Sequence, residues 1–273
     1  MVKLLVLFVI IVSVSFADSV LHDKIKGFIG EERYQKNRSF IEIIFKDAPS
    51  FYHNEHLNVV EVIETLKANG LLKLYFKEPK HLELRFHTNG TPLFFVTLMG
   101  DALRSIGYYR YLTQYSKSDS SGFVWQIGLT SEYMTDPTVL RRELLKRGCD
   151  ITDIERQSDT LWDYTIDMAQ AHLDVDRIAP EEQLFLKRSL TPHWVNISSV
   201  NKLKLTSLGS NSWYPYIAFF DAKLHLLKVY KRDKKTWQIK INMPDDAIYA
   251  KIGDLYNLKN IKDGLEAEAL GEK

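Results

Sequence analysis

Three glycines, Gly70, Gly107 and Gly148, each follow an amphipathic segment and precede an apolar one, at spacings of about 40 residues. Glycine takes left-handed backbone geometry after a helix without steric cost. The pattern predicts an internal repeat in which a strand, a capped helix and a second strand follow one another. It constrains the architecture strongly but carries no chemistry.

The middle copy of this repeat is the clearest. Residues 82–86 alternate apolar and charged side chains, which is the period of a half-buried strand. Thr91 is the expected N-cap, and Pro92 suits the first helical position. Apolar residues then recur at helical spacing up to Gly107, and residues 108–115 follow as a strand rich in aromatics.

The two flanking copies show the same order of elements. In the first copy we expect a strand at 40–45, a helix beginning near Asn58 and a strand at 71–76. In the third copy we expect a strand at 123–129, a helix capped by Asp136 and a strand at 151–157, with 161–166 as its hairpin partner.

Short turns at 78–80 and 117–122 join the copies, so the last strand of one copy should pair antiparallel with the first strand of the next. Consecutive units joined in this way give the split β-α-β arrangement of a ferredoxin-like sheet. We therefore expect tandem split β-α-β repeats over residues 40–168. A series of three copies either extends one sheet or begins a second one, and the sequence leaves both open.

The first residues predict export. Lys3 is followed by a short apolar run and by Ser15-Phe16-Ala17, which matches a secretory cleavage site. We expect a signal peptide over residues 1–17 and an N-terminal arm over 18–39. The alternative is a membrane anchor, but the run is shorter than the roughly 20 residues that a span requires. We expect no stable membrane span after cleavage.

The remainder of the chain changes character twice. A charged, helix-like pattern with a start at 179–182 predicts a helical connector over 169–190. Short strands separated by turns then predict an all-β sandwich over 191–270, and residues 266–273 resemble a frayed end. The expected fold class is α+β, with the tandem repeats followed by this C-terminal sandwich.

Charge and cysteine content restrict the function. The chain has a net charge of +1, whereas a nucleic-acid-binding protein usually carries a concentrated basic face, so we expect no nucleic-acid partner. Cys149 is the single cysteine, so the chain cannot form an intramolecular disulfide. In an exported protein this favours a periplasmic or secreted location in which the core alone holds the fold.

No complete catalytic or metal-binding pattern is present in the sequence. His53 and His56 are the nearest approach to a zinc site, which needs three or four fixed ligands, and a solvated loop explains them as well. Cys149 could be a nucleophile but more simply enters a buried strand. We predict no catalytic residues, no metal and no cofactor. Three carboxylate pairs leave glycoside hydrolysis open: Asp163 with Asp167, Asp174 with Asp176, and Asp245 with Asp246.

The aromatic residues of the C-terminal region are the main candidates for ligand or partner binding. Trp213, Tyr214 and Tyr216 follow a polar loop, and an aromatic side chain at a loop tip can stack on a sugar ring or anchor a partner protein. The alternative is that Trp194 and Trp237 fill the core while Trp213 covers its edge.

These observations favour a non-enzymatic binding or scaffolding protein of the bacterial cell envelope. Its expected partner is an envelope protein or a peptidoglycan-type glycan. Two alternatives remain open at this stage, a hydrolase of wall glycan or peptide and a solute-binding protein.

Overall fold

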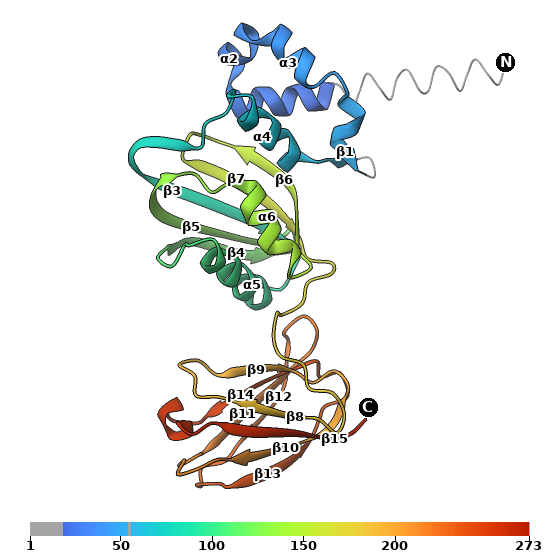
Figure 1. The fold of residues 1–273 in the computed structure, drawn as a ribbon, viewed down its shortest axis with the longest axis vertical. Coiled ribbons are helices and arrows are strands. Elements are labelled where there is room, and N and C mark those ends of the chain that lie inside the picture. Colours follow the sequence, from blue (N-terminus) through green and yellow to red (C-terminus); the bar gives the residue numbers. More distant parts are fainter. Residues whose placement is uncertain (1–18, 54–55, 273) are drawn as a thin grey trace, which may run out of the picture. The chain divides into compact units, whose positions relative to one another are not determined.

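The computed structural model describes residues 19–53 and 56–272 of this chain, which has a mixed α+β fold (Figure 1). The chain divides into two compact units, the first ending at Ala171 and the second beginning at His172. The expected signal peptide at 1–17 lies outside the described residues. Within those residues, no helix has the length and apolar character needed to cross a membrane.

The first unit combines helices with one five-stranded sheet. Its helical segments are residues 19–29, α2 (Glu31–Lys36), α3 (Arg38–Ile44), η1 (Ala48–Phe51), α4 (Val59–Ala68), α5 (Pro92–Ser105) and α6 (Pro137–Leu145). Its large sheet contains β3 (Tyr75–Thr88), β4 (Leu112–Asp119), β5 (Gly122–Tyr133), β6 (Asp150–Arg156) and β7 (Leu161–Asp167). A separate small pair consists of β1 (Tyr52–His53) and β2 (His56–Leu57).

The helix limits follow from local chemistry. The carboxylate of Asp136 accepts a hydrogen bond from the Thr138 amide at 3.0 Å, which caps α6, and Pro137 opens that helix. After α4, α5 and α6, the backbone φ angles of Gly70, Gly107 and Gly148 are +70°, +97° and +68°. The prediction that these glycines adopt left-handed geometry is confirmed.

The strands predicted for the first copy of the repeat are wrong. Residues 40–45, expected as a strand, lie mainly in the helix α3, because Ile41 and Phe45 are spaced by one helical turn and both are buried. The expected turn at 78–80 is also absent, since β3 runs through it as one strand. Residues 76–79 form a bulge opposite β5. Pro79, which has no backbone N–H, therefore lies where no hydrogen bond to β5 is needed.

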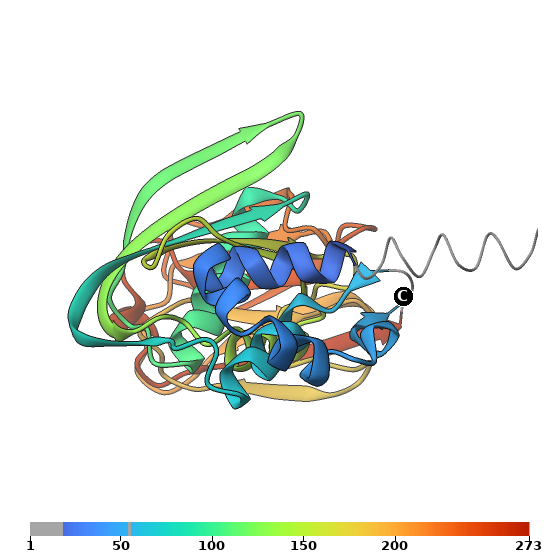
Figure 2. The same ribbon diagram turned by 90° about the horizontal axis from the view of Figure 1, so that it is seen from above.

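The sheet order of the first unit is β4-β5-β3-β7-β6. The pairs β4–β5, β5–β3 and β6–β7 are antiparallel, and the pair β3–β7 is parallel. The expected pairing of 151–157 with 161–166 is confirmed by the hairpin of β6 and β7. Helices α4, α5 and α6 lie over one face of this sheet (Figure 1), and the β4–β5 hairpin extends beyond the helices of this unit (Figure 2).

The second unit contains two four-stranded antiparallel sheets. One has the order β13-β10-β15-β8 and the other β12-β11-β14-β9. Buried residues of both sheets belong to one hydrophobic core. The strands are β8 (Gln183–Leu186), β9 (His193–Asn196), β10 (Val200–Ser207), β11 (Pro215–Phe220), β12 (Leu226–Lys231), β13 (Gln238–Asn242), β14 (Tyr249–Asp254) and β15 (Leu265–Glu272), with a 3-10 turn η2 (Leu258–Ile261).

Two predictions about the second unit are wrong. The segment 169–190 holds no helix: it contains turns and the strand β8, and Glu181 adopts a left-handed φ of +63°. The segment 266–273 is not frayed through its described part, because β15 lies between β10 and β8. Its buried side chains are Leu265, Ala267 and Ala269, and alanine gives little strand signal in a sequence.

Candidate functional site

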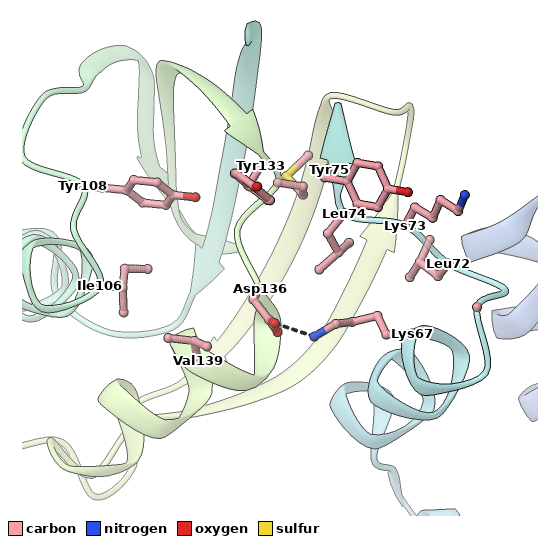
Figure 3. Close-up of a pocket in the computed structure, with 12 residues that line it drawn as sticks. Lys67, Leu72, Lys73, Leu74, Tyr75, Ile106, Tyr108, Tyr133, Asp136 and Val139 are labelled. Atoms are coloured by element: carbon pink, nitrogen blue, oxygen red, sulfur yellow. Dashed lines mark hydrogen bonds and ion pairs between the residues drawn. The ribbon is translucent and has the colours of Figure 1, made fainter. Parts of the chain in front are cut away.

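An open groove of about 590 Å³ lies in the first unit, where the ends of several elements meet (Figure 3). Lys67 comes from the last turn of α4, and Ile106 follows α5. Tyr133 ends β5, and Asp136 caps α6. Such a volume is in the range of small-molecule and sugar sites.

The polar centre of the groove is an ion pair between Lys67 and Asp136 (Figure 3). Their side chains are 27% and 33% exposed, so the pair is partly shielded but remains accessible from the groove. Asp136 is also the α6 cap, and this second interaction fixes its carboxylate. Both charges are therefore held in place before any ligand binds.

Three tyrosines line the same groove as this pair. Tyr75 and Tyr133 stand opposite one another on β3 and β5 and are 54% and 61% exposed. Tyr108 is more buried, and its hydroxyl points toward the middle of the groove (Figure 3). Leu72 and Met134 supply buried apolar surface to the lining. The groove thus combines aromatic faces with a few fixed polar groups, which is the usual composition of a ligand site.

Burial dominates the electrostatics of the groove wall. It raises the pKa of Tyr108, whose hydroxyl accepts a hydrogen bond from Thr135 Oγ1 at 3.2 Å. Behind this wall, burial raises the pKa of Tyr164 well above its ordinary value, and the nearby Tyr108 and Asp136 add to the effect. The Tyr164 hydroxyl has no hydrogen-bond partner among the described residues. Both phenols are therefore neutral at pH 7, and of the two only Tyr108 forms a hydrogen bond within the described part of the chain.

A scan of protein-family models and searches of the curated proteins and the solved structures find no match to this chain. The geometry of its own side chains is therefore the basis for assigning a site.

The predicted binding residue Trp213 is not at a loop tip. Its side chain is completely buried in the core of the second unit, where its indole N–H donates a hydrogen bond to the Gly253 carbonyl at 2.9 Å. Trp237, which the alternative assigned to the core, is 62% exposed. The two tryptophans have exchanged their expected places. Each lies just before a strand, Trp213 before β11 and Trp237 before β13, so packing between distant segments, not composition, decides which side chain faces inward.

Tyr214 and Tyr216 are both partly exposed, and their role in binding remains a prediction. Tyr214 contacts Tyr256 edge-on, with ring centroids 5.2 Å apart. Tyr216 lies on β11, between Lys231 of β12 and Gly253 of β14. The structure therefore separates the three predicted residues into one core side chain and two partly exposed ones.

The other candidates from the sequence do not assemble into a centre. His53 and His56 are exposed and paired across β1 and β2. Within residues 19–53 and 56–272, no group of three His, Cys, Asp or Glu side chains is placed to hold a metal ion. Cys149 is buried, and burial raises the pKa of its thiol to about 11, so at neutral pH it is not a thiolate nucleophile.

The carboxylate Asp163 belongs instead to a polar array across the first sheet. Arg85 Nε donates to Gln126 Oε1 at 3.0 Å, and Arg85 Nη1 lies 3.4 Å from Asp163 Oδ2. Gln126 Nε2 in turn donates to Glu83 Oε2 at 2.6 Å. These side chains alternate with buried residues, so they lie on the sheet face opposite the core. Because these side chains hydrogen-bond to one another, their contacts within the sheet explain why polar residues occur there.

Sequence reasoning missed the groove, whose polar residues are Lys67, Lys73, Tyr75, Tyr108, Tyr133 and Asp136. Only Asp136 was singled out, and only as a helix cap. One signal was available, since each of these residues lies at or near the end of a predicted element. The ends of elements in a βα unit are where binding residues gather.

Proposed function

We propose that this protein is an exported, non-enzymatic binding protein of the bacterial cell envelope, and that the groove of its first unit binds a wall polysaccharide. The observation that carries the proposal is the set of three tyrosines that line the same groove as the Lys67–Asp136 pair. Export rests on the sequence of residues 1–17.

The chemistry of the groove favours a hydroxyl-rich ligand. Tyr75 and Tyr133 offer large, exposed aromatic surface against which the apolar face of a sugar ring can pack. A sugar hydroxyl can donate to Asp136 and another can accept from Lys67, so the ion pair need not separate. A charged group placed at this pair would compete with one member and leave the other without its partner, at a cost in free energy.

The arrangement also favours binding over hydrolysis. Glycoside hydrolysis ordinarily needs two carboxyl groups that flank the scissile bond, one of them protonated. Among the described residues that line the groove, Asp136 is the only acid, and it is committed to Lys67 and to the helix cap.

For the fold we propose a finer description. The run β3-α5-β4-β5-α6-β6 has the element order of a split β-α-β unit, with β7 inserted between β3 and β6. The two sheets of the second unit are proposed to form a β-sandwich, which their common core supports. An experimental structure with the two sheets not face to face would contradict this description.

The function is tested by co-sedimentation of the purified mature chain with insoluble peptidoglycan. We expect Tyr133→Ala and Tyr75→Ala each to weaken binding by about tenfold, the effect of removing one aromatic anchor. Tyr109→Ala is the matched control, because Tyr109 is 75% exposed and does not line the groove.

Unchanged binding in both groove variants, or equal weakening in the control, would contradict the proposal. Release of soluble fragments from the peptidoglycan by the unmodified chain, lost in Asp136→Asn, would replace it with the hydrolase alternative. Circular dichroism of each variant excludes unfolding as the cause, which matters for Asp136 because it caps α6.

A further inference from the structure

Three loops of the second unit meet at one place through backbone hydrogen bonds. The Thr236 amide donates to the Trp213 carbonyl at 2.9 Å, and the Leu255 amide donates to the Tyr214 carbonyl at 2.8 Å. The Arg232 amide donates to the Pro215 carbonyl at 3.0 Å. The loops around residues 213, 235 and 255 are therefore fixed side by side, and we call them the loop cluster.

The loop cluster presents aromatic side chains in a fixed arrangement. Tyr256 is 61% exposed, meets Tyr214 at an interplanar angle of 79°, and donates its hydroxyl to Asp233. Asp254 accepts hydrogen bonds from the amides of Tyr214 at 2.7 Å and Tyr256 at 2.9 Å. Trp237 adds a second exposed aromatic surface directly after Thr236. Because the rings of Tyr214 and Tyr256 are already positioned, a ligand would lose little binding energy in ordering them.

The same cluster carries a concentration of positive charge. Lys231, Arg232, Lys234 and Lys235 are all exposed, and none of them forms an ion pair with another described side chain. Asp233, the acid among them, is engaged by the Tyr256 hydroxyl. The chain as a whole has a net charge of only +1, so these four cations form a local excess of positive charge.

We propose that the loop cluster is a second binding surface, distinct from the groove, and that it binds an acidic glycan. Sugar rings pack on Tyr256 and Trp237, and the carboxylate groups of the glycan pair with Arg232, Lys234 and Lys235. The planar guanidinium of Arg232 suits a carboxylate because it can donate two parallel hydrogen bonds.

The acids within the cluster favour a glycan over a nucleic acid. A nucleic acid carries one phosphate per nucleotide and is bound along a continuous basic path. Here Asp233 and Asp254 lie among the aromatic residues and interrupt such a path. Asp254 already accepts hydrogen bonds from the amides of Tyr214, Tyr256 and Asn257 and from the Asn260 side chain, so it is satisfied within the protein. A glycan whose charges are separated by neutral hydroxyl groups can place a hydroxyl against Asp233, which is exposed.

The test measures binding of the mature chain to an immobilised polyuronate, by surface plasmon resonance at low and physiological salt. We expect the double variant K234E/K235E to weaken binding by at least about tenfold, and Trp237→Ala by several-fold, because they remove charge pairing and ring packing respectively. Raising the salt concentration should weaken binding of the unmodified chain.

The matched control is K202E/K240E, which makes the same change in formal charge. Lys202 and Lys240 are exposed on β10 and β13, and Lys202 lies beside Asn242, at the end of β13 away from Trp237. The proposal expects this control to stay within about twofold of the unmodified chain. Thermal melting of all variants confirms that they are folded.

Three results would overturn the proposal. The first is equal weakening in the two double variants, which indicates a general charge effect. The second is undetectable binding of the polyuronate by the unmodified chain. The third is tighter binding of a single-stranded oligonucleotide through the same residues, which would assign the loop cluster to nucleic acid.

Discussion

The two units of this protein bury the apolar face of a sheet in different ways. In the first unit, helices bury one face of the sheet and a hydrogen-bonded polar array, centred on Arg85, occupies the other. In the second unit, buried residues of two sheets belong to one core. The proposed binding residues therefore come from the ends of helices and strands in the first unit, and from loops between strands in the second.

The exposure of aromatic residues also differs between the two units. In the first unit, exposed tyrosines such as Tyr133 lie beside helix ends and line a groove. In the second unit, an aromatic residue near a polar loop can be the centre of the core, as Trp213 is, or exposed, as Trp237 is. The stabilities of variants test this distinction.

The largest effect is expected for Trp213→Ala. Its side chain is fully buried and its N–H is hydrogen-bonded, so the change should lower the free energy of unfolding by about 3–5 kcal/mol. Trp237→Ala should change it by no more than about 0.5 kcal/mol, because that side chain is largely exposed. Urea titration measures both, and similar losses in the two variants would remove the contrast between them.

An intermediate effect is expected for the stop glycines of the first unit. Gly107→Val and Gly148→Val should each lower the free energy of unfolding by about 1–2 kcal/mol, because a β-branched residue is strained at a positive φ. Gly27→Val is a useful contrast, since Gly27 lies within a helix, has no positive φ and has open space at its Cβ position. Unchanged denaturation midpoints in both stop-glycine variants would contradict a structural need for glycine there.

A smaller effect is expected for the contact that joins α6 to β6. Arg141 donates to both oxygens of Asp150, at 2.6 and 2.8 Å, and a third nitrogen donates to Asn58 Oδ1 at 3.0 Å. Arg141→Lys keeps the charge but loses the planar fork, so we expect a loss of about 1 kcal/mol. Arg142→Lys is the control, because Arg142 is 69% exposed and its nearest carboxylate is 3.8 Å away. Equal stabilities of the two variants would show that the fork contributes nothing.

The smallest effect at neutral pH concerns Cys149, whose pKa burial raises to about 11. At pH 7 the thiol is neutral in both the folded and the unfolded chain. As the pH rises from 9 through 11, the unfolded chain loses the proton first, so stability should fall. In Cys149→Ala, the free energy of unfolding should therefore fall less between pH 8 and pH 10.5 than in the unmodified chain, as measured by urea titration at both values. An identical pH dependence in the variant would show that another group is responsible.

Much of the local structure was predictable from the sequence, because it depends on neighbours along the chain. Gly107 and Gly148 end their helices where expected, and strands β5, β6 and β7 fall on the predicted segments. The errors occurred where two local patterns compete. Residues 40–45 suit either a strand or a helix, and Ile41 and Phe45 become a helical face only through the contacts that bury them.

Tertiary structure decided the rest. The sheet order, with β7 between β3 and β6, follows from pairings between distant segments. The candidate groove joins Lys67, Tyr108 and Asp136, which lie far apart in the sequence and meet only when α4, α5 and α6 share one layer. The sequence by itself determined helix ends and strand periods, because backbone geometry acts over a few residues. Which side chains converge, and whether Trp213 or Trp237 faces water, depends on packing between elements that no local pattern records.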